Sequence, residues 1–195
     1  VDTALRATLD AMAIGGIYDQ LGGGFHRYAV DSTWTVPHFE KMLYDNALLI
    51  GSYAQAAVTF DDPLYRRIAT GIYQYVQREM TSPLGCFYTA QDAEVDHREG
   101  LSYLWQKHEI EAALSKEDAA FAIEQFGLDR GPNFQDPHHP EDKPASVLRL
   151  SARPDRLASR LGMSTEQYLA KLDAIAATLL AVRDRRKQPR LDDKS

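Results

Sequence analysis

The sequence contains little that would support disulfide, zinc-thiolate or membrane chemistry. Of its 195 residues, one is a cysteine, Cys86, which excludes an internal disulfide framework and a zinc site built from cysteines. The longest apolar run, Ala174 to Val182, has nine residues including a threonine, whereas a membrane-spanning helix needs about 20. No signal-peptide pattern opens the chain. We therefore expect a cytoplasmic protein without a membrane partner.

A surplus of basic residues and the usual cofactor motifs are also lacking. Lysine and arginine total 22 against 28 aspartate and glutamate residues, a net charge of −6, so we expect no nucleic-acid partner. The glycines at 22–24 are not followed by Gly-Lys-Ser/Thr, and no HExxH or Gly-x-Ser-x-Gly pattern occurs. His138 and His139 are adjacent in a proline-rich stretch, a poor arrangement for a metal site. We expect neither a metal ion nor a cofactor.

What remains is the composition of an ordinary globular domain. Hydrophobic residues make up 44% and charged residues 26% of the chain, which excludes disordered and fibrous proteins. The length favours a single domain, 1–195, that buries enough surface to fold without disulfides. Because the chain starts with Val1 rather than methionine, we expect it to be a piece of a longer protein.

Aromatic residues are concentrated in one part of the chain. Fifteen of the 19 lie between Tyr18 and Trp105, among them both tryptophans and nine tyrosines. Buried tyrosine and tryptophan need partners for their polar atoms, so one interpretation is a wall that meets a polar ligand. The alternative is a tyrosine-rich helical core.

Apolar periodicity and capping residues predict a mainly helical chain. Asp62 with Pro63, and Ser164 with Gln167, are typical of helix starts. Pro37 is also suited to the first position of a helix. Helices are expected at 5–14, 37–58, 63–80, 107–114, 116–126 and 165–187, a long loop at 127–144, and short strands at 25–30, 85–88, 101–105 and 147–150. The basic residues at 183–187 are expected to form a solvated helix end.

The polar stretch 22–46 carries the first candidate site. The 37–58 helix is apolar around most of its circumference, so we expect it to be buried on all sides. His38, Lys41 and Asp45 fall on one face near its amino end, and buried charges must be paired or face water. This end is expected to open into a pocket. The alternative is that His38 and Asp45 only cap and pair with neighbouring loops.

A second polar constellation follows the expected strand at 85–88. Gln91 and Asp92 lie where that strand ends, which is a common place for ligand-binding groups. Glu99 and Gly100 close the hairpin expected between this strand and the strand at 101–105. A turn-forming aspartate with a solvated charge explains Asp92 equally well.

These side chains suggest a sugar-binding site. Aromatic faces stack on sugar rings, two carboxylates can hydrolyse a glycosidic bond, and histidine can move protons in an isomerisation. We assign His38 and Asp45 as candidate catalytic groups. The candidate substrate-binding residues, which supply hydrogen bonds or ring faces, are His26, Arg27, Tyr28, Trp34, Glu40, Tyr44, Tyr88, Gln91 and Asp92.

Four long stretches of the chain resemble one protein family. They are GGIYDQLGGGFHRYAVDSTWTVPHFEKMLYDNALL (15–49), DPLYRRIA (62–69), REMTSPLGCFYTAQDAE (78–94) and the closing segment 186–194. They are similar to the thioredoxin-domain-containing family that includes the spermatogenesis-associated proteins. In that family a thioredoxin-like domain precedes a helical toroid similar to N-acylglucosamine 2-epimerases and six-hairpin glycosidases.

The resemblance implies an all-α fold: the opening part of an incomplete (α/α)6 toroid of helical hairpins with small β-hairpin insertions, without the thioredoxin-like domain. It also implies that ligands bind in the funnel at one end of the inner helices. We therefore expect a carbohydrate-active enzyme domain, a sugar isomerase or epimerase or a glycoside hydrolase, with a small-molecule substrate. The alternatives are a non-catalytic binding module that serves an upstream thioredoxin-like domain, and a purely structural role. Uncovered apolar helix surface also predicts self-association.

Overall fold

The computed structural model describes residues 2–192. Within this range the chain forms seven α-helices and seven strands of two residues each. The protein is therefore mostly helical with small antiparallel β-hairpins, as expected at that level. No helix in the described range combines the length and apolar character needed to cross a membrane. Asp193 and Lys194, which close the family-like segment, lie outside the described residues.

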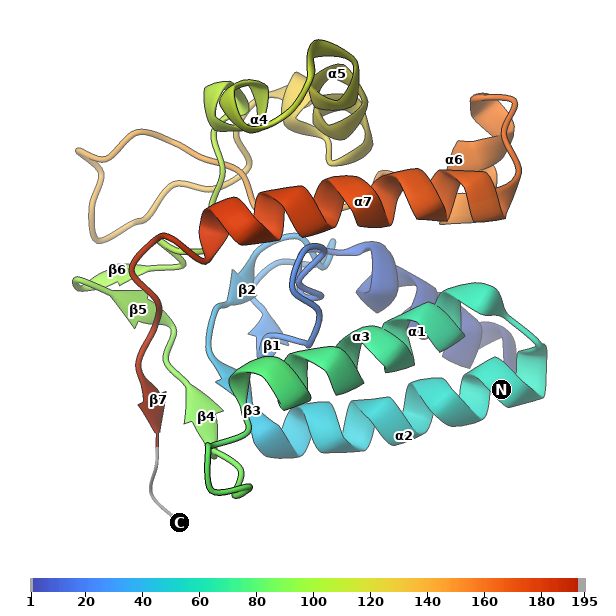
Figure 1. Ribbon diagram of the computed structural model, residues 1–195, viewed down its shortest axis with the longest axis horizontal. Coiled ribbons are helices and arrows are strands. Elements are labelled where there is room, and N and C mark those ends of the chain that lie inside the picture. The colour runs from blue at the N-terminus through green and yellow to red at the C-terminus, as the bar shows by residue number, and fades with distance from the viewer. Residues whose placement is uncertain (1, 193–195) are drawn as a thin grey trace.

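The helices form two groups on either side of the longest one (Figure 1). The bounds are α1 (Asp2–Ile14), α2 (Leu43–Phe60), α3 (Pro63–Glu79), α4 (Lys107–Ala113), α5 (Lys116–Gln125), α6 (Pro154–Arg160) and α7 (Thr165–Arg183), with a 3-10 turn η1 (Leu128–Arg130). Helix α7 lies between the α4–α5 pair and the α2–α3 hairpin. Because α2 and α3 are joined by a short turn, they pack as an antiparallel hairpin.

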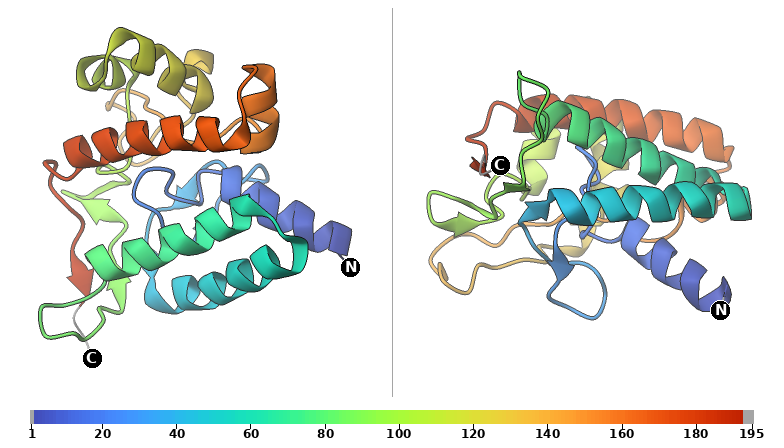
Figure 2. Two further views of the ribbon diagram at one scale, coloured as in Figure 1. Left: turned by 45° about the vertical axis from the view of Figure 1, so that its right-hand side comes forward. Right: turned by 90° about the horizontal axis from the view of Figure 1, so that it is seen from below.

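The strands gather at the end of the α2–α3 hairpin that is remote from its turn (Figure 2). Their bounds are β1 (Tyr28–Ala29), β2 (Pro37–His38), β3 (Lys41–Met42), β4 (Ala90–Gln91), β5 (Glu94–Val95), β6 (Arg98–Glu99) and β7 (Leu191–Asp192). Strand β1 pairs antiparallel with β2, and β5 with β6; β4 lies between β3 and β7. Segments from three distant parts of the chain thus meet at this end of the hairpin, whose strands carry His38, Lys41 and Gln91.

Two main hydrophobic cores flank this meeting place. One packs α1, α2 and α3 around Phe25, Tyr53, Tyr65 and Ile68. The other packs α4 to α7 around Trp105, Phe126, Tyr168 and Leu172. Most of the aromatic cluster is therefore core: Tyr53, Tyr65, Tyr75 and Trp105 are fully buried. Of the two interpretations of the aromatic residues, the helical core accounts for the larger share.

The predicted capping signals operate as expected. The side chain of Asp62 accepts a hydrogen bond from the Leu64 backbone N–H at 3.0 Å, and Pro63 occupies the first turn of α3. At the start of α7, Ser164 Oγ accepts from Gln167 N at 3.2 Å, and Gln167 Oε1 accepts from Ser164 N at 3.0 Å. These reciprocal bonds satisfy backbone N–H groups that the first helical turn leaves without partners.

The triple glycine at 22–24 brings its loop unusually close to α3. Gly23 has φ 75°, and a Cβ at this position would lie 2.3 Å from the carbonyl oxygen of Gly71. A Cβ on Gly24 would lie 2.4 Å from the Tyr75 ring. Both the left-handed backbone and the close approach therefore require glycine. This loop carries Asp19 and His26 on its flanks, so the contact with α3 sets the position of both.

The expected helix at 37–58 begins six residues later than predicted. Pro37–His38 and Lys41–Met42 are strands, and α2 begins at Leu43. The backbone pairs instead with distant chain: Tyr28 is opposite His38, and Lys41 is opposite Gln91. These tertiary hydrogen bonds outweigh the local helix-start signal of Pro37. His38, Lys41 and Asp45 consequently do not share a helix face, and that part of the prediction is wrong.

Complete burial of this helix is also a wrong prediction. The inner face of α2 buries Asn46, Tyr53, Ala56 and Ala57. On the other face, Leu48 is 71% exposed and Val58 is 81% exposed. Helix α2 therefore packs on one face only within the described part of the chain.

The strands expected around the 89–100 loop are placed differently. The expected strands at 85–88 and 101–105 do not pair with each other; Phe87 bridges Thr81, and Trp105 bridges Ser146. The hairpin is formed inside the expected loop by β5 and β6. Residues 147–150 form no strand, and α6 was not foreseen. Short strands of this kind depend on their partners more than on local propensity.

Candidate functional site

His38 is held at the edge of the fold by a carboxylate from a distant strand. Its Nδ1 lies 2.7 Å from Oε1 of Glu99 on β6, 61 residues further along the chain. The same oxygen accepts a hydrogen bond from the Phe39 backbone N–H at 3.2 Å. On its other side, the imidazole stacks on the Tyr28 ring with centroids 5.0 Å apart. With Nδ1 as donor to Glu99, the free Nε2 is a proton acceptor.

A second carboxylate approaches the opposite nitrogen of His38. Glu40 Oε2 lies 3.7 Å from His38 Nε2 and 2.7 Å from Nη1 of Arg27. The hydrogen bond and charge of Glu40 raise the pKa of Arg27, and a hydrogen bond to Tyr44 adds to this. Arg27 is thus fixed as a cation beside the carboxylate that faces His38. The imidazole lies between two carboxylates, one of which is neutralised by a guanidinium.

Asp45, in the first turn of α2, adds a carboxyl group with unusual surroundings. It is half-buried, and its Oδ2 atom is enclosed without a hydrogen-bond partner among the described residues. Burial raises the pKa of Asp45; Arg27 opposes this shift and Glu40 adds to it. A carboxyl group of this kind can serve as a proton donor. We call the residues Arg27, Tyr28, His38, Glu40, Tyr44, Asp45 and Glu99 the His38 cluster.

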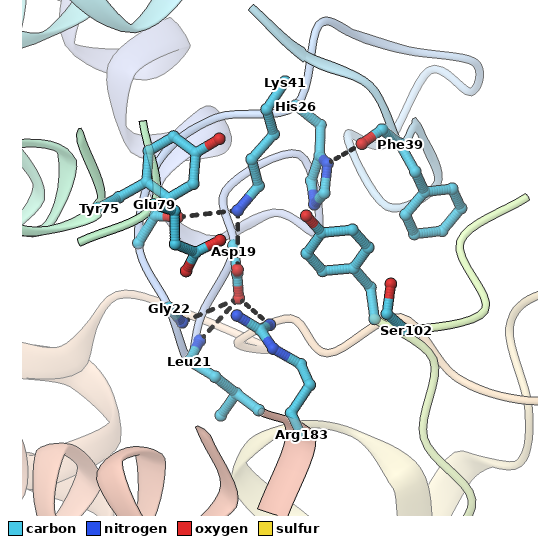
Figure 3. Close-up of polar contacts among 12 residues, drawn as sticks. Asp19, Leu21, Gly22, His26, Phe39, Lys41, Tyr75, Glu79, Ser102 and Arg183 are labelled. Carbon is cyan, nitrogen blue, oxygen red and sulfur yellow. Dashed lines mark hydrogen bonds and ion pairs between the residues drawn. The ribbon is translucent and has the colours of Figure 1, made fainter. Parts of the chain in front are cut away.

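A separate network of charged residues lies inside the protein (Figure 3). Lys41 Nζ is 2.8 Å from Oδ2 of Asp19, and Nη1 of Arg183 is 2.8 Å from Oδ1 of the same residue. Lys41 also donates to the Gly23 carbonyl at 3.0 Å. Its ammonium lies over the Tyr75 ring, 4.3 Å from the centroid. We call this set the buried ionic network.

Burial and neighbouring charges shift the pKa values of this network and of His26. Burial acts to raise the pKa of Asp19, but Arg183 and Lys41 hold it well below its usual range. Burial lowers the pKa of Lys41, an effect that Asp19 opposes. Burial, together with the charge of Lys41, lowers the pKa of His26 to about 3. His26 is therefore neutral at pH 7.

Two predicted binding residues belong to this interior rather than to a surface. His26 is 3% exposed, and its Nδ1 lies 2.9 Å from the Phe39 carbonyl oxygen. Gln91 is 4% exposed; its Oε1 accepts from Tyr103 at 2.9 Å and from Tyr75 at 3.2 Å. Both residues are enclosed by the fold, so direct contact with a ligand would require the interior to open.

Three other predicted residues lie apart from both groups. Trp34 is half-buried against the core of α1 to α3, and its carbonyl oxygen accepts from the Gly16 N–H at 2.8 Å. Tyr88 is half-buried and its backbone N–H pairs with Met80. Asp92 is exposed and its Oδ1 accepts from the Glu94 N–H at 3.3 Å. For Asp92 this is the turn geometry of the alternative interpretation.

Three residues that position the His38 cluster and the buried ionic network were given no such role from the sequence. Glu99 was placed only as the end of a hairpin, yet it orients His38. Asp19 carried no expected role, and Arg183 was expected at a solvated helix end but is 3% exposed. The pairs span 61 residues for Glu99–His38 and 164 for Arg183–Asp19. No local spacing could indicate contacts of this range.

The described residues offer no arrangement for a metal ion. No group of three or more histidine, cysteine, aspartate or glutamate side chains is positioned to hold one within residues 2–192. The chemistry available to the His38 cluster from its own side chains is hydrogen bonding, ring stacking and proton transfer.

The chain is similar to proteins from several animals. Human spermatogenesis-associated protein 20 is 35% identical over 204 residues, which cover 96% of this chain, and the mouse protein of the same name is 34% identical over the same share. An uncharacterized protein of Caenorhabditis elegans is 33% identical over 97% of this chain. The chain spans about a quarter of the length of these curated relatives, 26% to 28%. No protein-family model matches the chain.

Proposed function

We propose that the His38 cluster is a sugar-binding site that transfers protons, in a carbohydrate-active domain of the isomerase or epimerase type. The observation that carries the proposal is the position of the His38 imidazole between Glu99 at 2.7 Å and Glu40 at 3.7 Å. Glu99 fixes the ring and its tautomer, so that Nε2 can accept a proton from a ligand carbon or hydroxyl. Two carboxylates flank one histidine, which favours histidine-based proton transfer over hydrolysis by a facing carboxylate pair.

The other members of the His38 cluster have matching roles in this proposal. Tyr28 and Tyr44 are 51% and 49% exposed, so their rings can stack on a sugar ring. Arg27 neutralises Glu40 and can bind a ligand hydroxyl. Asp45, whose pKa is raised by burial, is the candidate group that would return a proton to the substrate. An exchange of protons between two faces of one carbon is the chemistry of an epimerase.

The remaining parts of the proposal concern the whole protein. We propose that the α2–α3 hairpin and the other helices belong to a six-hairpin toroid that follows a thioredoxin-like domain. Support comes from the sequence resemblance and from the helical hairpin of α2 and α3. In this arrangement the His38 cluster, at the strand-bearing end of the hairpin, would face the funnel of the toroid.

A second candidate function is sugar binding without catalysis, in service of the upstream domain. The openness of the cluster favours it: the side chain of Arg27 is 43% exposed, and half of each tyrosine faces solvent. Exclusion of water, which proton transfer at carbon benefits from, would then depend on chain segments beyond those described here.

The test is proton NMR of the protein in D2O with a panel of hexoses, N-acetylated amino sugars and short glycosides. The proposal predicts deuterium at a sugar carbon, lost in His38→Gln and reduced in Glu99→Gln. His138→Gln, an exposed histidine, is the matched control and should retain exchange. Sugar binding without any deuterium incorporation would favour the binding module. Exchange that persists in His38→Gln would overturn the assignment of the base.

A further inference from the structure

A groove of about 550 Å³ lies between helices α3 and α7 (Figure 1). Residues of α3 form one wall, residues of α7 form the other, and residues 21–23 of the glycine loop lie between them. The volume is within the range of sizes that hold small ligands. We call it the α3–α7 groove. None of the described residues that line it belongs to the His38 cluster.

A buried tyrosine brings its hydroxyl to this groove. Tyr18 lines the groove and is 4% exposed, and its Oη makes no hydrogen bond within residues 2–192. Side-chain polar atoms that lack both a partner and accessible surface in this range belong to Gln20, Asp45, Ser102 and Trp105. The Tyr18 hydroxyl is not one of them, so a molecule in the groove can reach it.

Gly71 on α3 leaves room for this hydroxyl. A Cβ at position 71 would lie 2.1 Å from Tyr18 Oη, so a larger residue would displace or cover the hydroxyl. Glycine weakens the interior of a helix, and its place here is explained by that close approach. Because Gly71 itself lines the groove, the Tyr18 hydroxyl lies at the α3 wall.

The α3 wall gives the groove a positive charge that the chain as a whole does not have. The chain carries a net charge of −6. The charged side chains among the described residues that line the groove are Arg66, Arg67, Arg78 and Asp173, a surplus of two positive charges. A phosphate monoester carries about −1.5 to −2 charges at pH 7, which matches this surplus.

Two of these arginines keep a donor nitrogen unused. Arg67 donates to Oδ1 of Asp173 from Nε at 3.0 Å and from Nη2 at 2.5 Å. Arg78 donates from Nη2 to the Gly22 carbonyl oxygen at 2.6 Å and to Glu79, which does not line the groove. Neither Nη1 atom makes a hydrogen bond within the described part of the chain. The existing bonds hold both guanidiniums in place, so each Nη1 is pre-positioned for a ligand.

Both guanidiniums act on the Tyr18 hydroxyl. Burial raises the pKa of Tyr18 to about 12, and the positive charges of Arg67 and Arg78 oppose this shift, Arg67 more strongly. The carboxylates of Asp19 and Asp173 add to the shift. Arg67 and Arg78 are about three turns apart on α3, and the hydroxyl lies near both. Its proton is therefore available to an anion that two cations attract.

The α7 wall of the groove is apolar apart from Asp173. It is formed by Leu169, Ala176, Ala177 and Leu180. A ligand that joins an apolar body to an anionic group can place the body against this wall and the anion at α3. An apolar wall opposite a cationic wall distinguishes the groove from arginines on an open surface.

We propose that the α3–α7 groove binds an organic phosphate. Tyr18 Oη and Arg67 Nη1 donate hydrogen bonds to the phosphate oxygens, Arg66 and Arg78 supply further positive charge, and the α7 wall contacts the body of the ligand. A phosphate dianion only accepts hydrogen bonds, so it suits a wall whose unused groups are donors. The inference does not rest on the proposed function, because the two sites have separate residues.

The experiment is calorimetric titration of the chain with phenyl phosphate, inorganic phosphate, benzoate and phenol. Amide chemical shifts of the isotope-labelled chain locate each bound probe. Tyr18→Phe removes the hydroxyl, and Tyr73→Phe, at a 56% exposed position outside the groove, is its matched control. Arg67→Gln removes the neighbouring cation, and Arg160→Gln, at an exposed position on α6, is the control for that change.

The expected result is binding of phenyl phosphate, with amide shifts at residues 18–23 and 67–78. Inorganic phosphate should bind more weakly, because it makes no contact with the α7 wall. Tyr18→Phe and Arg67→Gln should each weaken binding of phenyl phosphate by about tenfold, as expected for a lost hydrogen bond to a charged group. The two control variants should change it by less than about twofold. Added salt should weaken binding in wild type.

The thermal midpoint of the free protein separates a ligand role of the hydroxyl from a structural one. Tyr18→Phe should leave the midpoint unchanged, because the hydroxyl has no partner among the described residues. A lower midpoint in Tyr18→Phe would indicate that the hydroxyl supports the fold instead, and would overturn its assignment to a ligand.

Other outcomes would also overturn the inference. These are no binding of phenyl phosphate, tighter binding of benzoate or phenol than of phenyl phosphate, or an affinity that Tyr18→Phe leaves intact. The result is separable from the test of the proposed function. Deuterium exchange at a sugar carbon depends on the His38 cluster and should be the same in Tyr18→Phe and in wild type.

Discussion

Lys41 and Asp19 form an ion pair of 2.8 Å in the protein interior, where the Lys41 side chain is fully buried. Asp19 is also bound by Arg183 at the carboxyl end of α7 and by the backbone N–H groups of Leu21 and Gly22. The carboxylate therefore joins the glycine loop, β3 and α7, which belong to different parts of the chain. Because burying a charge is costly unless it is paired, the buried cations Lys41 and Arg183 each require the Asp19 carboxylate.

The first prediction follows from the dependence of both buried cations, Lys41 and Arg183, on the Asp19 carboxylate. Asp19→Asn leaves two buried cations without their shared carboxylate, and should lower the free energy of unfolding by about 3–5 kcal/mol. Lys41→Met keeps the Asp19–Arg183 pair and fills a similar volume, so its loss should be smaller. Urea unfolding followed by circular dichroism measures both.

The control for this pair is an ion pair at the surface. Asp96→Asn removes the partner of Lys187, whose side chain is 69% exposed, and should change the free energy of unfolding by less than about 1 kcal/mol. If Lys41→Met proves more destabilising than Asp19→Asn, the carboxylate is not the centre of the buried ionic network.

A second prediction concerns the pH dependence of stability. The pKa of His26 is lowered to about 3 by burial and by the charge of Lys41, whereas an unfolded chain titrates near 6.5. Below pH 6.5 the unfolded state therefore binds a proton that the folded state does not. The stabilisation is complete above about pH 6.5 and is lost as the pH falls toward 3, by at most about 1.4 kcal/mol per pH unit.

Unfolding experiments between pH 7 and pH 4 measure this slope. His26→Gln should flatten it, although the variant also loses stability at neutral pH, so the slopes rather than the absolute values are compared. His108→Gln, at an exposed position, should leave the slope as it is. Equal slopes in wild type and His26→Gln would contradict the buried neutral state of His26.

A third prediction concerns the uncovered side of α2. Leu48 and Val58 are 71% and 81% exposed, and exposed apolar surface of this kind promotes association. The chain is expected to form dimers or larger species at high concentration in light scattering. Leu48→Lys combined with Val58→Lys should shift it toward the monomer without loss of stability.

The matched control places the same two charges elsewhere. Gln74→Lys combined with Gln77→Lys, at exposed positions on α3, adds equal positive charge away from that face and should not dissociate the species. A wild-type chain that stays monomeric at high concentration would show that the α2 face does not mediate association.

Local signals in the sequence account for much of the helical framework. Asp62 and Pro63 at the start of α3, and Ser164 and Gln167 at the start of α7, were predicted because a capping side chain bonds within three residues of itself. The same short range explains why part of the polar stretch 22–46 was correctly predicted to lie together. Arg27, Tyr28, His38 and Glu40 meet across the β1–β2 pairing, which spans few residues.

The wrong predictions concern positions where tertiary contacts, which no local signal indicates, decide the structure. Pro37 signals a helix locally, but pairing of His38 with Tyr28 and of Lys41 with Gln91 forms strands there instead. Trp34 and Asp92 were grouped with the site by composition, yet neither joins the His38 cluster. Residue type alone does not indicate which elements a side chain will meet.

The sequence by itself therefore determined where most helices begin and that several polar residues of 22–46 lie together. Both depend on contacts between close neighbours in the chain. Only the tertiary structure decided that Glu99 orients His38 and that Asp19 binds Lys41 and Arg183. Those relationships arise when whole elements pack to bury their apolar faces, and burial then selects the pairing that each charge requires.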